Sequence, residues 1–336
     1  MKAATLESKF PLLAVENGCI VSKEADVTVA FRVELPELFS VTGSEYEAVH
    51  SAWHKAVKVL PEYSIVHKQD FFIEEKYRPE TDRDDLSFLS RSFERHFNER
   101  PFLNHFCYLF LTKTTKARSR QESTFSTLCK GRLVPKEIED RETVTRFIEA
   151  VGQFEKIMND SGLVTLRRLT TDEITGTERS AGIVEKYLSL SQHDTTVLKD
   201  IQLNPEEMRI GDDILCLHTL SDTEDLPGKV ATDSRYERLS TDRSDCRLSF
   251  AAPVGLLLDC NHCYNQYIFI DDHGENLKRF EQTARNMHSL SRYSRSNQIN
   301  KAWIEEYLNE AHSKGLTSVR CHCNVMAWSD DREELR

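Results

Sequence analysis

The residues best suited to bind a metal ion are four cysteines in two closely spaced pairs. Cys260 and Cys263 form one pair, and Cys321 and Cys323 form the other. Two such thiol pairs can ligate zinc tetrahedrally. The apolar alternation around Cys321 and Cys323 favours another interpretation, in which both are small core residues of a strand. We expect no metal site here, although the sequence leaves open whether these cysteines ever bind metal.

A second pair of potential ligands is His50 and His54, which lie four residues apart in an expected helix. That spacing places both imidazoles on one helix face, where they can share a metal ion. The apolar residues around them favour the interpretation that both border a buried stripe. The sequence therefore predicts no catalytic, cofactor-binding or metal-ligating residue in this chain.

A nucleotide site is not indicated either. A phosphate-binding loop needs two glycines, a lysine and a hydroxyl at fixed spacing. Gly228 and Lys229 are the best match, but Val230 follows them and Thr223 stands where the first glycine belongs. We therefore expect these residues to be non-enzymatic and to bind neither ATP nor Mg.

Two basic segments are candidates for contact with nucleic acid or an acidic partner. The first is residues 113–132, where six basic side chains occur with one acidic side chain. The second is a helical stretch over residues 278–295, with Glu281 among Lys278, Arg279, Arg285, Arg292 and Arg295. Such charges usually only contact solvent. Nucleic-acid binding, as an accessory module, is therefore kept as the alternative function of this chain.

The composition is that of a globular protein. The 336 residues carry a net charge of −11, which argues against a general nucleic-acid-binding surface. Nine cysteines without a regular framework, and no N-terminal signal peptide, predict reduced thiols in the cytoplasm. The longest apolar run, residues 102–111, is too short to cross a bilayer. We expect contact with a membrane only through partners.

A strand–helix–strand unit over residues 26–73 organises the first half. Residues 27–35 alternate as a half-buried strand, and Ser44 with Glu47 has the spacing of a capping box. The helix should end before Pro61. Further expectations are a hairpin at Asn17-Gly18, a helix over 88–97 and a buried strand over 105–111.

The rest of the chain shows a helical segment and a second strand–helix–strand unit. Helices are expected over residues 144–158 and 170–190, the latter opening on Thr170 and Glu173 but weakened by Gly176 and Gly182. Later elements are strands over 214–220 and 264–270, helices over 277–290 and 299–311, and a strand over 317–328. Whether the polar stretch 221–247 is ordered stays open.

These elements predict an α+β fold with two sheet-bearing halves. We expect a first domain over residues 1–135, a helical connecting segment over 136–199 and a second domain over 200–336. Residues 330–336 have the acidic start of a further helix. We therefore expect the second domain to be truncated and the chain to be a fragment of a longer protein.

Several blocks go beyond such generic patterns. They are residues 6–13, 27–39, 67–79, 97–101 and 108–114. In these blocks, and along its whole length, the chain resembles the N-terminal region of TraG-family proteins of Bacteroides-type conjugative transposons. Those proteins are similar to the VirB-type ATPases of type IV secretion.

The resemblance implies a non-catalytic assembly region that precedes a P-loop ATPase domain absent from this chain. ATP and Mg would belong to that missing domain. The implied partners are inner-membrane components of the conjugation apparatus, with self-association as a further option. The implied location is cytoplasmic and peripheral to the inner membrane, and the sequence does not separate DNA transfer from pilus assembly.

Overall fold

A computed structural model shows how these elements assemble. It describes residues 10–36, 41–77, 87–115, 141–195, 197–204, 207–220, 234–243, 245–248, 255, 257–290, 293–316 and 318–335. Helices and a large antiparallel sheet make up this part of the chain, so the expected α+β class is confirmed.

One antiparallel sheet dominates the described residues and contains 11 of their strands. Its order across the sheet is β1 (Leu12–Glu16), β2 (Cys19–Ser22), β3 (Val27–Glu34), β5 (Pro101–Lys113), β4 (Ser64–Lys76), β12 (Asn261–Ile270), β13 (Val319–Ser329), β9 (Asp213–Thr219), β8 (Met208–Ile210) and β7 (Ile201–Leu203). A short strand, β6 (Thr165–Arg168), also pairs with β3. A separate hairpin joins β10 (Ser234–Arg235) to β11 (Arg247–Leu248).

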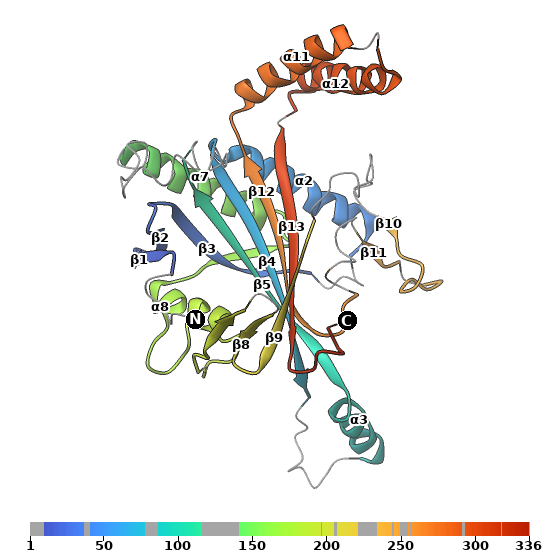
Figure 1. The fold of residues 1–336 in the computed structure, drawn as a ribbon. Helices are drawn as coiled ribbons and strands as arrows, with labels where there is room; N and C mark the ends of the chain where they lie inside the picture. The colour runs from blue at the N-terminus through green and yellow to red at the C-terminus, as the bar shows by residue number, and fades with distance from the viewer. Residues whose placement is uncertain are drawn as a thin grey trace.

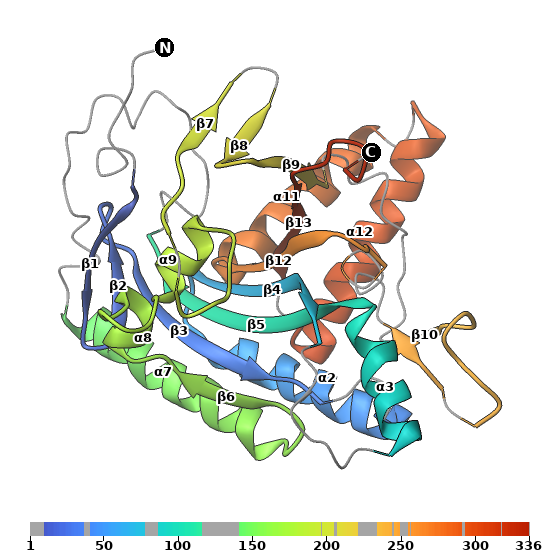
Figure 2. The ribbon, with the colours of Figure 1, turned by 90° about the horizontal axis from the view of Figure 1, so that it is seen from below.

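The helices lie on both faces and beyond both ends of this sheet (Figures 1 and 2). They are α2 (Gly43–Val59), α3 (Phe88–Asn98), α7 (Arg141–Asp160), α8 (Thr171–Thr175), α9 (Ile183–Leu188), α11 (His273–Leu290) and α12 (Arg295–Lys314). None of the helices in the described residues combines the length and apolar composition that crossing a membrane requires.

The first core lies between the sheet and the two long helices α2 and α7 (Figure 2). Phe31 and Leu109 from the sheet, Ala56 from α2, and Phe147 and Phe154 from α7 are all 0% exposed. The apolar residues of α7 recur every three or four positions, which places them on one side of the helix. The helix α7, which belongs to the segment expected as a connector, is therefore part of this core.

The second core lies on the opposite face of the sheet, under α8 and α9. Phe71 and Trp328 face Ile174 and Leu190 there, and all four are buried. Phe71 and Trp328 contact edge to face, with ring centroids 6.5 Å apart. Because both faces of the central strands are covered, β5 has the near-continuous apolar sequence of a strand buried on both sides.

The two halves share a single sheet, which corrects the expectation of two sheet-bearing halves. β12 pairs with β4 over nine consecutive positions, from His262 opposite Phe72 to Ile270 opposite Ser64. Alternation along a strand shows which residues share a face but not which strand lies beside it. The domain boundaries at 135 and 199 stay a prediction, and the first lies outside the described residues.

Several local predictions are confirmed. The Asn17-Gly18 turn has positive φ at both residues and joins β1 to β2, as a two-residue hairpin requires. The helix α2 ends before Pro61, and α12 ends at Gly315 in the left-handed conformation. Thr170 and Glu173 form the expected capping box.

Three helix predictions were wrong in detail. The capping box of α2 is Thr42 with Glu45, because Thr42 also has a glutamate three residues later and starts the helix two residues earlier than expected. The segment 170–190 is two short helices, separated where Gly176 adopts a φ of 88°. Residues 332–335 form a turn rather than the start of another helix.

Two helical elements project beyond the sheet. Figure 1 shows α3 beyond one end of β4 and β5, and the hairpin of α11 and α12 beyond the end of β12 and β13. Phe280 and Tyr307 pack between the two hairpin helices, with ring centroids 5.0 Å apart. Buried residues are nevertheless absent from α11, and in α12 only Ala311 is buried.

Candidate functional site

A cluster of ionisable side chains lies at the centre of the sheet, beside the first core. Asp70 of β4 accepts a hydrogen bond of 2.8 Å from Nε2 of His105 in β5, and its other oxygen pairs with Nζ of Lys68. Asp70 lies directly opposite Cys107 on β5 and opposite Tyr264 on β12. Because paired residues point to the same face, three adjacent strands place these side chains together.

The charges in this cluster follow from burial and proximity. Burial alone would raise the pKa of Asp70, but the Lys68 ammonium and the hydrogen bonds from His105 and Lys68 lower it to about 2. Burial opposes a charged Lys68, but the Asp70 carboxylate, through its charge and its hydrogen bond, raises the pKa of Lys68 above its usual value. Burial raises the pKa of the Cys107 thiol, which is therefore protonated and a poor nucleophile at neutral pH.

Stacked rings extend the cluster across three strands. The Phe72 ring lies between His105 and His262, at 4.6 Å from each ring centroid. His262 is 0% exposed, and its two ring nitrogens lie 2.8 Å from the carbonyl oxygen of Cys260 and 2.7 Å from that of Gly255. The short segment before β12 is thereby attached to this face of the sheet.

A second polar network lies on the other face, where the two halves meet. The Oδ1 atom of Asn265 accepts hydrogen bonds from His67 at 2.8 Å and Gln69 at 3.0 Å, and its Nδ2 donates to Asn324. His67 also stacks on Tyr267, with ring centroids 4.2 Å apart. Burial lowers the pKa of His67 to about 4, against the effect of its Asn265 hydrogen bond, so this imidazole is neutral at pH 7.

His50 and His54 line a cavity of about 450 Å³ between α2 and the ends of β12 and β13. Its walls are mainly apolar, and Asp271 and His273 at the base of the hairpin also line it. Asp271 forms an ion pair with Arg320, which donates to both carboxylate oxygens. Among the described residues, His50 and His54 belong to no group of three potential ligands close enough to hold a metal.

The structure does not bring the two cysteine pairs together. In the β12–β13 ladder Cys263 lies beside Met326, whereas Cys321 lies opposite Ile268. These positions are five residues apart along the strands, or roughly 16 Å, and they point to opposite faces. A four-cysteine zinc site is therefore not formed. Cys321 is also exposed rather than the core residue that its alternation predicted.

The basic segments do not form one positive surface in the described residues. Lys113 is buried and donates to the carbonyl oxygen of Glu62, while residues 116–132 lie outside the described part. The stretch 278–295 is divided between α11 and α12, and Arg292 is not described. Arg285 lies 3.9 Å from Glu281 in an ion pair. Nucleic-acid binding stays a prediction.

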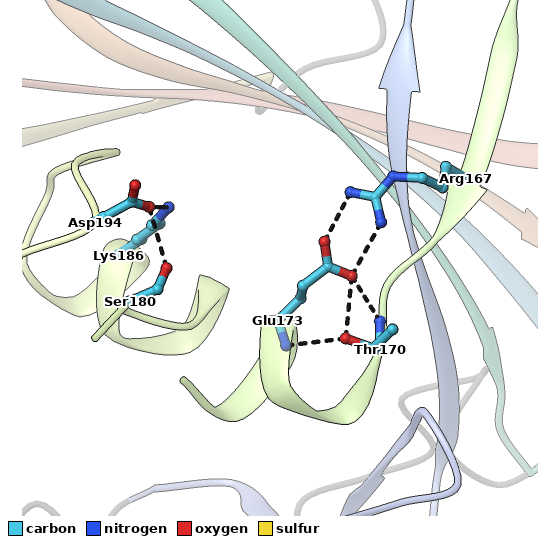
Figure 3. Close-up of polar contacts among 6 residues, drawn as sticks. All are labelled: Arg167, Thr170, Glu173, Ser180, Lys186 and Asp194. Atoms are coloured by element: carbon cyan, nitrogen blue, oxygen red, sulfur yellow. Dashed lines mark hydrogen bonds and ion pairs between the residues drawn. The ribbon is translucent and has the colours of Figure 1, made fainter. Parts of the chain in front are cut away.

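Two ion-pair clusters hold α8 and α9 in place (Figure 3). Both terminal nitrogens of the Arg167 guanidinium donate to the Glu173 carboxylate, which also accepts a hydrogen bond from the backbone N–H of Thr170. Hydrogen bonds from Arg167, opposed by partial burial, lower the pKa of Glu173 to about 2. Asp194 accepts hydrogen bonds from Lys186 and Ser180 in the same way. These contacts are structural, because each donor faces its own acceptor and not a cleft.

The largest exposed apolar side chains of the described part include those of α3. Phe88, Leu89, Phe93 and Phe97 are 82%, 77%, 60% and 44% exposed. The expected row of Leu89, Phe93 and Phe97 is thus present, but it belongs to neither core of the described residues. The hairpin exposes a second set, comprising Leu290, Tyr293, Ile299 and Trp303.

A protein-family model matches the N-terminal end of the chain. Residues 1–51 match a family described as a domain of unknown function, B. Theta Gene description (DUF3875). The described part of this match contains β1, β2, β3 and the first half of α2. No curated protein matches the chain.

Proposed function

We propose that this chain is a docking module of a conjugative-transfer protein, and that α3 is its main contact surface. The apolar row of α3, with Leu89 and Phe93 77% and 60% exposed, carries this proposal. Contiguous exposed apolar patches mark interaction sites on proteins. The helix is followed directly by β5, which begins at Pro101.

The energetics favour a partner that covers this row. Burying a large apolar side chain contributes about 1.5–3 kcal/mol, so three or four such residues provide a strong contact. Phe93 and Phe97 already stack, with ring centroids 4.5 Å apart, and together form one aromatic surface. Arg91 and Arg95 lie on the other side of α3, where they remain solvated.

The hairpin of α11 and α12 provides a second contact surface. Tyr293 and Trp303 are 84% and 65% exposed there, and Trp is among the residues most enriched in protein interfaces. The hairpin stands beyond the sheet (Figure 1), so a partner can contact it without disturbing either core.

The conjugative role rests on the sequence resemblance, and the family match over residues 1–51 supports only its Bacteroides-type part. Under this proposal the partners are inner-membrane components of a type IV secretion apparatus of Bacteroides type, reached from the cytoplasm. ATP hydrolysis belongs to a P-loop domain elsewhere in the protein. Purified chain should therefore show no ATP turnover.

Site-specific photocrosslinking in a conjugating strain tests the docking surface. A photoreactive amino acid at Phe93 or Trp303 of the complete protein should crosslink to an inner-membrane component. With the photoreactive amino acid at Leu89 instead, the variant Phe93→Ser should weaken the crosslink and reduce transfer, whereas Asn98→Ser, on the polar side of the same helix, should do neither. Normal transfer by a Phe93→Ser/Phe97→Ser protein that is present at normal levels would refute the proposal.

The salt dependence of DNA binding distinguishes the nucleic-acid alternative from docking through α3. Contacts to phosphates weaken steeply as salt rises. Binding of DNA to the purified chain that falls with salt and is lost in Lys278→Glu/Arg279→Glu would favour this alternative over docking through α3.

A further inference from the structure

We propose that Asp70, His105 and Cys107 form a binding site for one divalent transition-metal ion, with zinc as the best fit. One ligand atom from each residue lies within 4.8 Å of the other two. No other group of three His, Cys, Asp or Glu residues in the described part meets this criterion. The three residues come from the two central strands of the sheet.

Strand geometry explains why these ligands converge. His105 and Cys107 are two residues apart on β5, so their side chains point to the same face. Asp70 is the direct partner of Cys107 in the β4–β5 ladder. Both strands are 13 residues long and pair throughout their length. Such a framework fixes the ligand positions before any metal arrives.

The donor set identifies the metal class. A thiolate, an imidazole and a carboxylate are the three ligand types of protein zinc sites. Three protein ligands also leave one position open for water or another ligand. The side chains of Asp70 and His105 are 5% and 35% exposed, so a buried site retains an entry route along His105.

Lys68 does not bind the metal itself but holds the carboxylate of Asp70 in place. It pairs with Oδ2 of Asp70, which leaves Oδ1 available to a metal. Carboxylate ligands are commonly held by a further hydrogen bond of this kind. Without metal, Oδ1 accepts the Nε2–H of His105.

Binding then requires a defined movement of protons. The His105 proton shifts from Nε2 to Nδ1, so that Nε2 can donate its lone pair to the metal. The Cys107 thiol releases one proton to solvent and ligates as the thiolate. Asp70 pairs with the Lys68 ammonium, so it ligates as the carboxylate and loses no proton. One metal ion enters and one proton leaves.

Titration of the purified chain with Co²⁺ under reducing, oxygen-free conditions tests this site. Cobalt replaces zinc in such sites and gives a sulfur-to-cobalt charge-transfer absorption only when a thiolate binds it. We expect this absorption to saturate at one equivalent and to disappear when zinc is added. Lys68→Met should weaken binding by about tenfold to a hundredfold.

Matched variants distinguish this site from adventitious binding. Cys107→Ser should abolish the charge-transfer absorption, and His105→Gln should weaken binding, while Cys321→Ser and His50→Gln should leave both unchanged. Circular dichroism of each metal-free variant establishes that it is folded, and Cys107→Ala provides a second test if the serine is not tolerated. An absence of the absorption in the wild-type chain, or its persistence in a folded Cys107 variant, would overturn the proposal.

Discussion

His67 and Asn265 are joined by a hydrogen bond of 2.8 Å although 198 residues separate them in the sequence. The bond crosses from β4 to β12 and connects the two halves of the chain within one sheet. His67 also stacks on Tyr267 of the second half and on Phe110 of the first half, so the imidazole lies between rings from both halves. The charge of this histidine therefore affects the contact between the halves.

We expect the stability of the fold to decrease as pH falls from about 6.5 to 4. Burial lowers the pKa of His67 to about 4, whereas the unfolded chain has an ordinary value near 6.5. In this range the unfolded chain binds the proton more strongly than the folded chain does. The stabilisation that neutral His67 provides is therefore complete above pH 6.5 and is lost as pH falls towards 4. The maximum loss is about 3 kcal/mol.

Urea unfolding of the wild type and His67→Gln at pH 7 and pH 4.5 measures this effect. The variant should lose less stability than the wild type between the two pH values. An equal loss in both proteins would show that other groups cause the acid sensitivity.

Asp70→Asn should destabilise the chain by about 3–5 kcal/mol, because it leaves the Lys68 ammonium without its counter-charge. Asp70 is 4% exposed, so water cannot replace the lost carboxylate. The double variant Asp70→Asn/Lys68→Met should recover part of this loss. A double-mutant cycle by urea unfolding in metal-free buffer measures the interaction free energy between Asp70 and Lys68. Additive effects of the two substitutions would contradict this prediction.

Phe154→Ala should cost about 3–5 kcal/mol of unfolding free energy. Phe154 is 0% exposed and contacts Trp53 of α2, with ring centroids 5.8 Å apart. The exposed substitution Thr145→Ala on the same helix should change stability by less than about 0.5 kcal/mol. Similar values for the two variants would mean that α7 does not pack as part of the first core.

Phe93→Ser should leave stability within about 0.5 kcal/mol of the wild type, despite removing a large apolar side chain. At 60% exposure, Phe93 loses little burial when the chain unfolds. Thermal unfolding of Phe93→Ser beside Phe154→Ala measures the contrast. A large loss in Phe93→Ser would indicate that α3 belongs to the core, and its transfer phenotype could no longer be attributed to docking.

Thr170→Ala should destabilise the chain by about 1 kcal/mol through loss of the cap of α8. The pKa of its partner Glu173 is about 2 in the fold. The stabilisation that ionised Glu173 provides is therefore complete at pH values above its ordinary pKa near 4.3, and it is lost as pH falls towards 2. Unfolding at pH 7 and pH 3 should show a smaller difference between wild type and Thr170→Ala at pH 3.

The sequence by itself determined the local structure. The Asn17-Gly18 turn, the end of α2 before Pro61 and the Thr170–Glu173 cap each depend on residues within a few positions, so their types suffice to predict them. The apolar stripe of α7 was equally predictable from its spacing. The stripe of α3 was predicted as well, but spacing does not reveal whether a core covers it.

Only the tertiary structure decided which strands are neighbours. The pairing of β4 with β12 placed both halves in one sheet, and the pairing of β4 with β5 placed Asp70 beside Cys107. The spacing of His105 and Cys107 was visible in the sequence, but their third ligand was not. Strand pairing depends on backbone hydrogen bonds between distant segments, and any extended segment offers the same donors and acceptors.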